Sequence, residues 1–178
     1  MIIENTDFPE VKKIIAFRVN DERGVFSKII NSEFLLENGM RSDFREIYYS
    51  ESNKNVVRGM HFQAPPHDHA KIVHVLRGEV EDVIIDLRRT SVNFGKCISI
   101  KLSENIPEAI YIPEGFAHGF ASLKDRTMVL YAVTSCYCSE ADKGICWNSI
   151  PHDWKIKHPI ISERDKSFPR LESFQTPF

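Results

Sequence analysis

Short segments in which polar and apolar residues alternate recur along the middle of the chain, and they constrain its fold more than any other feature. The alternation is clearest in KCISIKL (96–102) and EAIYIP (108–113), and turn-forming residues separate such segments at intervals of ten to fifteen residues. This spacing is typical of an antiparallel β-sandwich or β-barrel. The strands expected on this basis cover residues 13–19, 58–63, 71–78, 79–88, 96–102, 108–113 and 127–135.

Helices are expected to be few and short. The sequence predicts one helix over SKIINSEFL (27–35), another near the C-terminus, and an irregular wrap in the residues that follow Trp147. We expect PEGFAHG (113–119), which is rich in turn residues, to connect two strands. The 178 residues are sufficient for one domain with a substantial core. We therefore predict a single all-β domain, residues 1–178, with short peripheral helices around a barrel that holds one small-molecule cavity.

Composition and charge argue against several classes of protein. The formal net charge is −2, so bulk electrostatics gives no reason to expect a nucleic acid or a membrane surface as a partner. The apolar runs of the N-terminal MIIENTDFPEVKK are too short for a secretion signal or a membrane span. The four cysteines lack the paired spacing of a zinc ribbon and are expected to be free thiols. We therefore predict a cytoplasmic protein.

Histidines are concentrated in one stretch, RGMHFQAPPHDHAKIVHVLRGEV (58–80), which contains His61, His67, His69 and His74. His67 and His69 form an HxH pair, and a PxGxxH motif ends at His118, as in metal-binding jelly rolls of the cupin type. Such a site also needs a carboxylate shortly after the HxH pair, whereas this chain has Lys71, which would repel a cation. We therefore expect His67 and His69 to be solvated loop histidines and predict no metal. A metal-dependent cupin isomerase or oxygenase that uses His67, His69 and His118 is kept as the alternative.

Three other residues allow two interpretations each at this point. His61 and His118 are bracketed by apolar residues and glycine, so each is either a buried core histidine or a buried imidazole that accepts a proton. Lys71 shares a predicted strand face with Val73 and Val75. Its ammonium group either extends to water at the end of the strand or is aimed into the cavity.

The order of several motifs identifies a family that this chain resembles. RGMHFQ (58–63), KIVHVLRG (71–78) and IPEGFAHGF (112–120), with DERG (21–24) before them and ISERD (161–165) after them, resemble the dTDP-4-dehydrorhamnose 3,5-epimerase family over most of the chain. The resemblance implies a homodimeric jelly-roll barrel of the cupin type that needs no metal or other cofactor. It also implies a nucleotide-linked 4-keto-6-deoxy sugar as substrate. The implied reaction removes a proton from a carbon beside the ketone and returns one to the opposite face, as a step in the biosynthesis of surface polysaccharide sugars.

The resemblance also implies roles for individual residues. His61 matches the base, and Asp165 matches the carboxylate that orients it. Lys71 would lie beside the C4 oxygen, and Tyr131 matches the proton donor. The positions that match substrate-binding residues of the family are Arg23, Arg58, His118, Tyr137, Asp142 and Arg164. The resemblance implies that the two arginines Arg23 and Arg58 hold the pyrophosphate, and that Arg23 reaches in from the partner subunit or on a swapped N-terminal strand.

The chain departs from the family pattern at positions that belong to substrate recognition. Lys28 stands where the family usually has a glutamate, and Glu46 and Tyr48 replace a glutamine and an asparagine. Because one carboxylate can accept two N–H groups of guanine, Glu46 makes a GDP-linked hexose or heptose a candidate beside a dTDP-linked sugar. Alternatively, Glu46 pairs with Lys28. The sequence does not distinguish inversion at C3, at C5 or at both.

A third hypothesis is a nucleotide-sugar binding protein that kept the fold without the activity. Retention of His61, Tyr131 and Asp165 argues against it, since a binding protein has no use for a base and an acid on opposite faces of a sugar. We therefore predict an epimerase.

Overall fold

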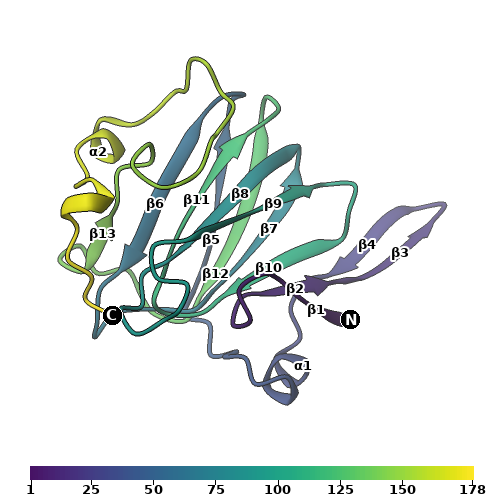
Figure 1. Ribbon diagram of the computed structural model, residues 1–178. Coiled ribbons are helices and arrows are strands. Elements are labelled where there is room, and N and C mark those ends of the chain that lie inside the picture. The colour runs from purple at the N-terminus through teal and green to yellow at the C-terminus, as the bar shows by residue number, and fades with distance from the viewer.

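Two antiparallel sheets face one another and form the body of the protein (Figure 1), of which the computed structural model describes residues 1–178. The six-stranded sheet has the order β1 (Ile2–Asn5), β2 (Lys12–Ile15), β10 (Glu108–Ile112), β7 (Lys71–Arg77), β12 (Thr127–Val133) and β5 (Glu46–Ser52). The five-stranded sheet has the order β13 (Asp142–Gly144), β6 (Val57–Gln63), β11 (Phe116–Ser122), β8 (Glu79–Asp86) and β9 (Cys97–Ser103). This is the all-β jelly-roll architecture that the sequence predicted.

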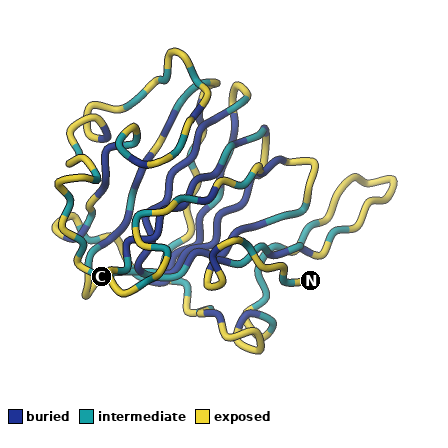
Figure 2. Tube along the Cα trace, viewed as in Figure 1, coloured by how far each residue is buried: buried dark blue, intermediate teal, exposed yellow.

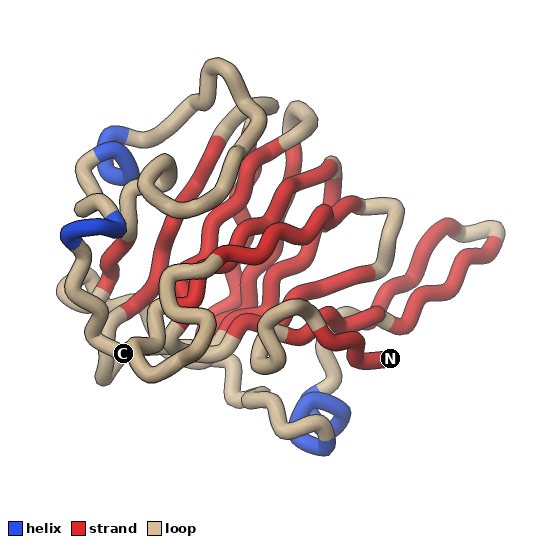
Figure 3. Tube along the Cα trace, viewed as in Figure 1, coloured by secondary structure: helices blue, strands red, loops and turns tan.

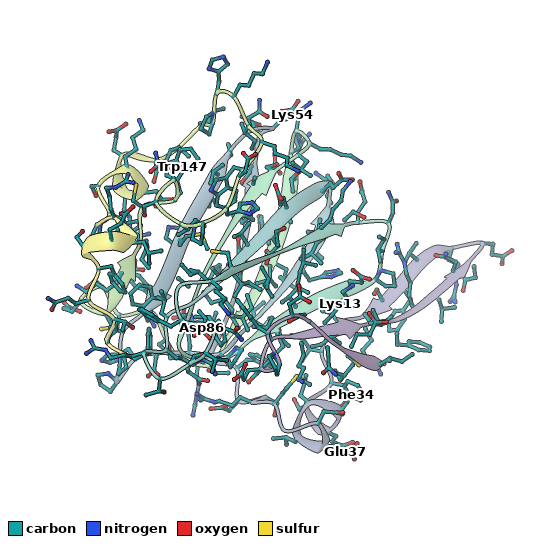
Figure 4. All side chains as sticks on the ribbon, viewed as in Figure 1. Lys13, Phe34, Glu37, Lys54, Asp86 and Trp147 are labelled. Atoms are coloured by element: carbon teal, nitrogen blue, oxygen red, sulfur yellow. The ribbon has the colours of Figure 1, made fainter.

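One hairpin and three short helices lie outside the two sheets. The hairpin of β3 (Phe17–Asp21) and β4 (Gly24–Lys28) extends away from them, and its residues are largely exposed (Figure 2). The helices are α1 (Ser32–Glu37), α2 (Glu163–Lys166) and the 3₁₀ turn Leu171–Ser173. Phe34 on α1 and Trp147 in the segment that leads to α2 lie on opposite sides of the molecule (Figure 4). None of the helices combines the length and the apolar composition that a membrane span requires.

Alternation along the strands divides the apolar residues into three layers. On β7, Val73 points into the space between the sheets, while the neighbouring Ile72 points out toward α1, where Leu35 covers it. The outer face of the five-stranded sheet is covered by the C-terminal wrap, which packs Trp154 and other side chains against residues such as Ile85. Burying these three layers is the main apolar driving force of the fold.

The strands predicted around the barrel are present, whereas two predicted segments have different bounds (Figure 3). The segment 13–19 is two strands rather than one. It breaks at Ala16, whose N–H donates to the Pro107 carbonyl, because β2 stays in the sheet while β3 leaves it to pair with β4. The helix predicted over 27–35 was wrong in its bounds. It begins after Asn31, whose side chain accepts the Phe34 N–H as an N-cap.

The interpretation of 113–119 as a turn was also wrong over most of its length. Only the residues up to Gly115 form the turn, and Phe116–Ser122 is the buried strand β11. Gly119 is required there for packing, because a Cβ at this position would lie 2.7 Å from the Arg58 carbonyl oxygen on β6. The glycine therefore marks a close approach of two strands and not a change of direction.

Candidate active site

A cavity of about 490 Å³ lies between the two sheets. Among the residues that the sequence singled out, its lining includes Glu46, Arg58, His61, Lys71, His118, Tyr131, Tyr137, Asp142 and Arg164. These side chains come from β5, β6, β7, β11, β12, β13, the loop after β12 and α2. The fold therefore brings residues from most of the chain to one internal site, as expected for a small-molecule pocket.

His61 and Asp165 form a hydrogen-bonded pair on the wall made by the five-stranded sheet. Nε2 of His61 lies 2.9 Å from Oδ1 of Asp165, and the backbone N–H of Gly59 donates to Oδ2 at 3.0 Å. Ser162 caps α2 by accepting the Asp165 N–H, which fixes the position of the carboxylate. Burial raises the pKa of Asp165, but these hydrogen bonds outweigh that effect and hold its pKa below the ordinary value. An ionised Asp165 keeps the proton on Nε2, so Nδ1 of His61 is left to accept one.

Tyr131 lies on the opposite wall. It belongs to β12 of the six-stranded sheet, and its ring stacks on that of Tyr48 with centroids 5.0 Å apart and an interplanar angle of 21°. Burial raises the pKa of the Tyr131 phenol, so the hydroxyl keeps its proton at neutral pH. The cavity thus has a proton acceptor on one sheet and a proton donor on the other.

Lys71 supplies the positive charge of the cavity interior. Its side chain is buried, and Nζ makes no hydrogen bond or ion pair within the chain. Burial lowers the pKa of Lys71 to about 8, while the carboxylates of Asp82 and Asp142 act in the other direction. Of the two interpretations of Lys71, the structure therefore supports the cation that is aimed into the cavity.

His118 forms a second imidazole–carboxylate pair, with Asp82. The Nε2–Oδ2 distance is 2.7 Å, and both side chains are buried. Burial lowers the pKa of His118, although Asp82 opposes the shift. Sequence reasoning missed Asp82. The available signal was a carboxylate in the apolar run DVIIDL, because a buried charge requires a partner.

Charged residues at the ends of the cavity are already engaged with neighbours. Arg58 donates from Nε to the hydroxyl of Ser52 at 3.0 Å. Glu46 accepts the backbone N–H of Tyr137 through Oε1 at 3.0 Å, and no ion pair joins it to Lys28 within the chain. An ion pair of 2.6 Å joins Arg164 on α2 to Asp142 on β13.

Comparison with known proteins places the chain in a family. The family model described as dTDP-4-dehydrorhamnose 3,5-epimerase matches residues 5–173. The chain belongs to the dTDP-4-dehydrorhamnose 3,5-epimerase family. A relative of that name from Shigella flexneri is 35% identical over 168 residues, which are 93% of each chain. Another, from Methanothermobacter thermautotrophicus, is 40% identical over 156 residues, 85% of this chain and 84% of its own.

Solved structures of 3,5-epimerases have the same fold. A dTDP-6-deoxy-D-glucose-3,5-epimerase from Legionella pneumophila, in complex with dTDP-4-keto-L-rhamnose, matches with a TM-score of 0.93 and 32% identity over 98% of this chain and 94% of its own. The Bacillus anthracis dTDP-4-dehydrorhamnose 3,5-epimerase with TDP and PPi bound matches with a TM-score of 0.92, 32% identity and coverage of 96% and 99%. The predicted family, jelly-roll fold and class of enzyme are confirmed.

Two residues lie outside the cavity of their own chain, although the resemblance to the 3,5-epimerase family placed their positions in substrate recognition. Arg23 is on the extended β3–β4 hairpin, where 85% of its side chain is exposed and it pairs with Asp21. Lys28, at the end of the same hairpin, is also exposed. The expectation that Arg23 contributes to the site of a partner subunit stays a prediction.

The expectation that His69 is a solvated loop histidine was wrong. His67 is exposed, as predicted for a loop histidine, but His69 lines the cavity. Its Nδ1 lies 3.1 Å from the hydroxyl of Ser135 and 3.3 Å from Nε2 of Gln63. The backbone turns its imidazole into the cavity rather than toward solvent.

The chain has no cluster of side chains that could bind a metal ion. No group of three or more His, Cys, Asp or Glu side chains is placed to hold a metal ion. His67, His69 and His118 therefore do not form the triad that the metal-dependent alternative requires. The predicted independence of cofactors stays a prediction, which metal analysis of the purified protein tests.

Proposed function

We propose that the protein, acting as one domain over residues 1–178, inverts C3, C5 or both in a nucleotide-linked 4-keto-6-deoxy sugar for surface polysaccharide biosynthesis. The observation that carries the proposal is the placement of His61 and Tyr131 on opposite walls of one cavity that also holds Lys71. Inversion requires that a proton leave one face of the sugar and return to the other, which a single wall cannot accomplish.

The mechanism follows from the positions of three groups. Nδ1 of His61 removes the proton from a carbon beside the C4 ketone, because Asp165 holds the other ring nitrogen. The electrons move to the C4 oxygen, and the ammonium group of Lys71 stabilises the resulting enolate. The Tyr131 hydroxyl then donates a proton to the same carbon from the opposite side.

We propose dTDP as the nucleotide, because the relatives are named for dTDP-linked sugars. GDP is the second candidate. The second candidate rests on Glu46, which lines the cavity and uses only Oε1 in its bond to the Tyr137 N–H. Oε2 has no partner in the chain and is free to accept an N–H of a base, and guanine offers two such groups.

Hydrogen exchange in D₂O tests the function directly. Loss of the C3 and C5 proton signals is followed by NMR with dTDP- and GDP-linked 4-keto-6-deoxyglucose. Exchange with one nucleotide identifies it and shows which carbons react. His61→Asn should abolish exchange while ligand affinity changes by less than about tenfold. Undiminished exchange by that variant would mean that His61 is not the base.

The two competing functions predict different results. A binding protein would bind the sugar nucleotide without any exchange. A metal-dependent enzyme would carry a stoichiometric transition metal, and removal of that metal by a chelator would remove its activity.

We also propose that the protein is a homodimer in which the β3–β4 hairpin crosses to the other subunit. The hairpin exposes apolar side chains that a partner would cover, among them Phe17, Val25 and Phe26. Arg23 would then reach the pyrophosphate held by Arg58 of the other chain.

Mixed dimers test this arrangement. Arg23→Ala and His61→Asn should each be inactive or severely impaired alone. A mixed dimer contains one site with both native residues, so mixing the two variants should restore activity. If mixing restores nothing although co-purification of differently tagged subunits shows that mixed dimers form, Arg23 does not act in the partner's site.

A further inference from the structure

One end of the cavity, beyond Lys71, carries polar groups that the proposed proton transfer does not use. The pairing of β7 with β12 continues past the strand end, because Ala70 N–H donates to Oγ1 of Thr134 at 3.0 Å and Thr134 N–H donates to the Ala70 carbonyl at 3.1 Å. His69 is therefore placed opposite Ser135 and, two residues before Lys71, on the same face as the lysine.

The imidazole of His69 is held at one nitrogen and free at the other. Gln63 accepts the Cys138 N–H through Oε1 at 2.7 Å, which turns its amide nitrogen toward Nδ1 of His69. The Ser135 hydroxyl lies 3.1 Å from the same Nδ1. Nε2 has no partner in the chain, and the ring lines the cavity.

His69 has a different chemical role from His61. Burial, with the positive charges of Lys71 and Arg41, lowers the pKa of His69 to about 3. The ring is neutral at any pH at which the enzyme works, so it is a hydrogen-bonding group and not the base.

The substrate offers one polar and one apolar group beside its ketone. In a 4-keto-6-deoxyhexose, C3 carries a hydroxyl and C5 carries a methyl group. Residues i and i+2 of an extended segment, such as His69 and Lys71, lie about 6.6 Å apart along the backbone. Two neighbouring oxygens of one sugar ring can span this separation, with one hydrogen bond to each side chain. If Lys71 binds the C4 oxygen, the polar end beside it suits the C3 hydroxyl, while the methyl group suits the end that contains Phe120.

We propose that His69 is a specificity-determining residue that binds the C3 hydroxyl of the 4-keto sugar through Nε2. The inference rests on the function proposed above and names the sugar substituent that the site reads. A hydroxyl both donates and accepts, so the bond forms with either tautomer of the imidazole.

Two variants of His69 separate its two nitrogens. His69→Asn keeps a polar atom near the position of Nδ1, and with it the contact to Ser135, but removes the group at Nε2. His69→Gln reaches the position of Nε2. The exposed His67, two residues earlier, provides the matched control His67→Asn.

The readout is exchange in D₂O of the C5 proton, or of the protons on C3 where the enzyme reacts only at C3, because both carbons carry protons with or without a C3 hydroxyl. The substrates are 4-keto-6-deoxyglucose and 4-keto-3,6-dideoxyglucose, linked to the nucleotide that the wild type accepts. We expect His69→Asn to lower kcat/KM about 3- to 10-fold for the 3-hydroxy sugar only, the effect of one neutral hydrogen bond. His69→Gln should restore most of the loss, and His67→Asn should match the wild type on both sugars.

Two results would overturn the inference while leaving the proposed function intact. Equal losses on both sugars would mean that His69 only supports the wall, and no loss on either would mean that it does not touch the substrate. Wild-type exchange on the 3-hydroxy sugar is the separate requirement of the proposed function. Absence of exchange at both C3 and C5, with both nucleotides, would overturn the function and the inference together.

Discussion

His61 and His118 lie directly opposite each other on β6 and β11, and each is bound to a carboxylate of its own. The two pairs differ in access. The His61 side chain is 30% exposed toward the cavity, whereas that of His118 is 5% exposed. A base must reach a proton on the substrate, so the geometry favours His61 for that role and leaves His118 to shape the cavity wall.

Replacement of Asp165 by asparagine should reduce kcat about 10²- to 10⁴-fold with little loss of fold. Asparagine can still accept the Gly59 N–H, but it cannot stabilise a positively charged His61. Steady-state kinetics and a thermal melt of the same sample check this. A variant that keeps its melting temperature and its full kcat would show that the carboxylate is dispensable.

Activity should fall on the alkaline side as Lys71 loses its proton. Because burial lowers the pKa of Lys71 to about 8, kcat/KM should decline about tenfold per pH unit above that value. Lys71→Arg keeps its charge at high pH, so whatever activity it retains should lack this decline. An identical alkaline limb in the arginine variant would assign the limb to another group.

The same lysine should reduce stability at neutral pH. Its folded pKa, about 8, lies below the ordinary 10.5, so between these values the unfolded chain binds more protons and stability rises with pH. Lys71→Met should therefore be inactive yet gain on the order of 3 kcal/mol of unfolding free energy at pH 7 from this effect. Urea unfolding at pH 7 and pH 10 should show the gain shrinking with pH. A gain that does not depend on pH would come from packing alone.

Gly144→Ala should displace Phe168, which packs against His61, and so disturb the active site. A Cβ there would lie 2.3 Å from the ring of Phe168, which packs edge-on against His61 with centroids 5.7 Å apart. We expect a loss of about 1–3 kcal/mol of stability together with a lower kcat. Phe168→Ala removes the clash, so the double variant should be more stable than the sum of the two single effects predicts. Strict additivity would show that Phe168 is not the obstacle.

Strand positions were predictable because alternation is local, whereas several site residues depend on distant partners. The inward turn of His69 follows from pairing with Ser135, which lies 66 residues further along the chain. The role of Asp82 in an apolar strand depends on its hydrogen bond to His118, a partner on another strand. His61, Lys71 and Tyr131 were found through motifs, and the structure brings them into one cavity.

The boundaries that failed had similar causes. The break at Ala16 depends on where the neighbouring strand β10 begins, which local hydrophobicity does not indicate. The start of α1 was set by the capping side chain of Asn31, which overrode the apolar run before it. The glycine-rich 113–119 has strand geometry over most of its length because β6 approaches it closely.

The carboxylate that orients His61 belongs to a part of the chain that is synthesised after every strand of the two sheets. The ribosome has made every strand of both sheets once Gly144 is added, and Asp165 follows only afterwards. The residues after Gly144 also cover the outer face of the five-stranded sheet, where Ile150 and Trp154 are buried, so this segment completes the wall that carries His61 as well as orienting its imidazole. A chain that stops before residue 165 would therefore lack both the carboxylate that orients His61 and part of the apolar cover of the sheet that holds it.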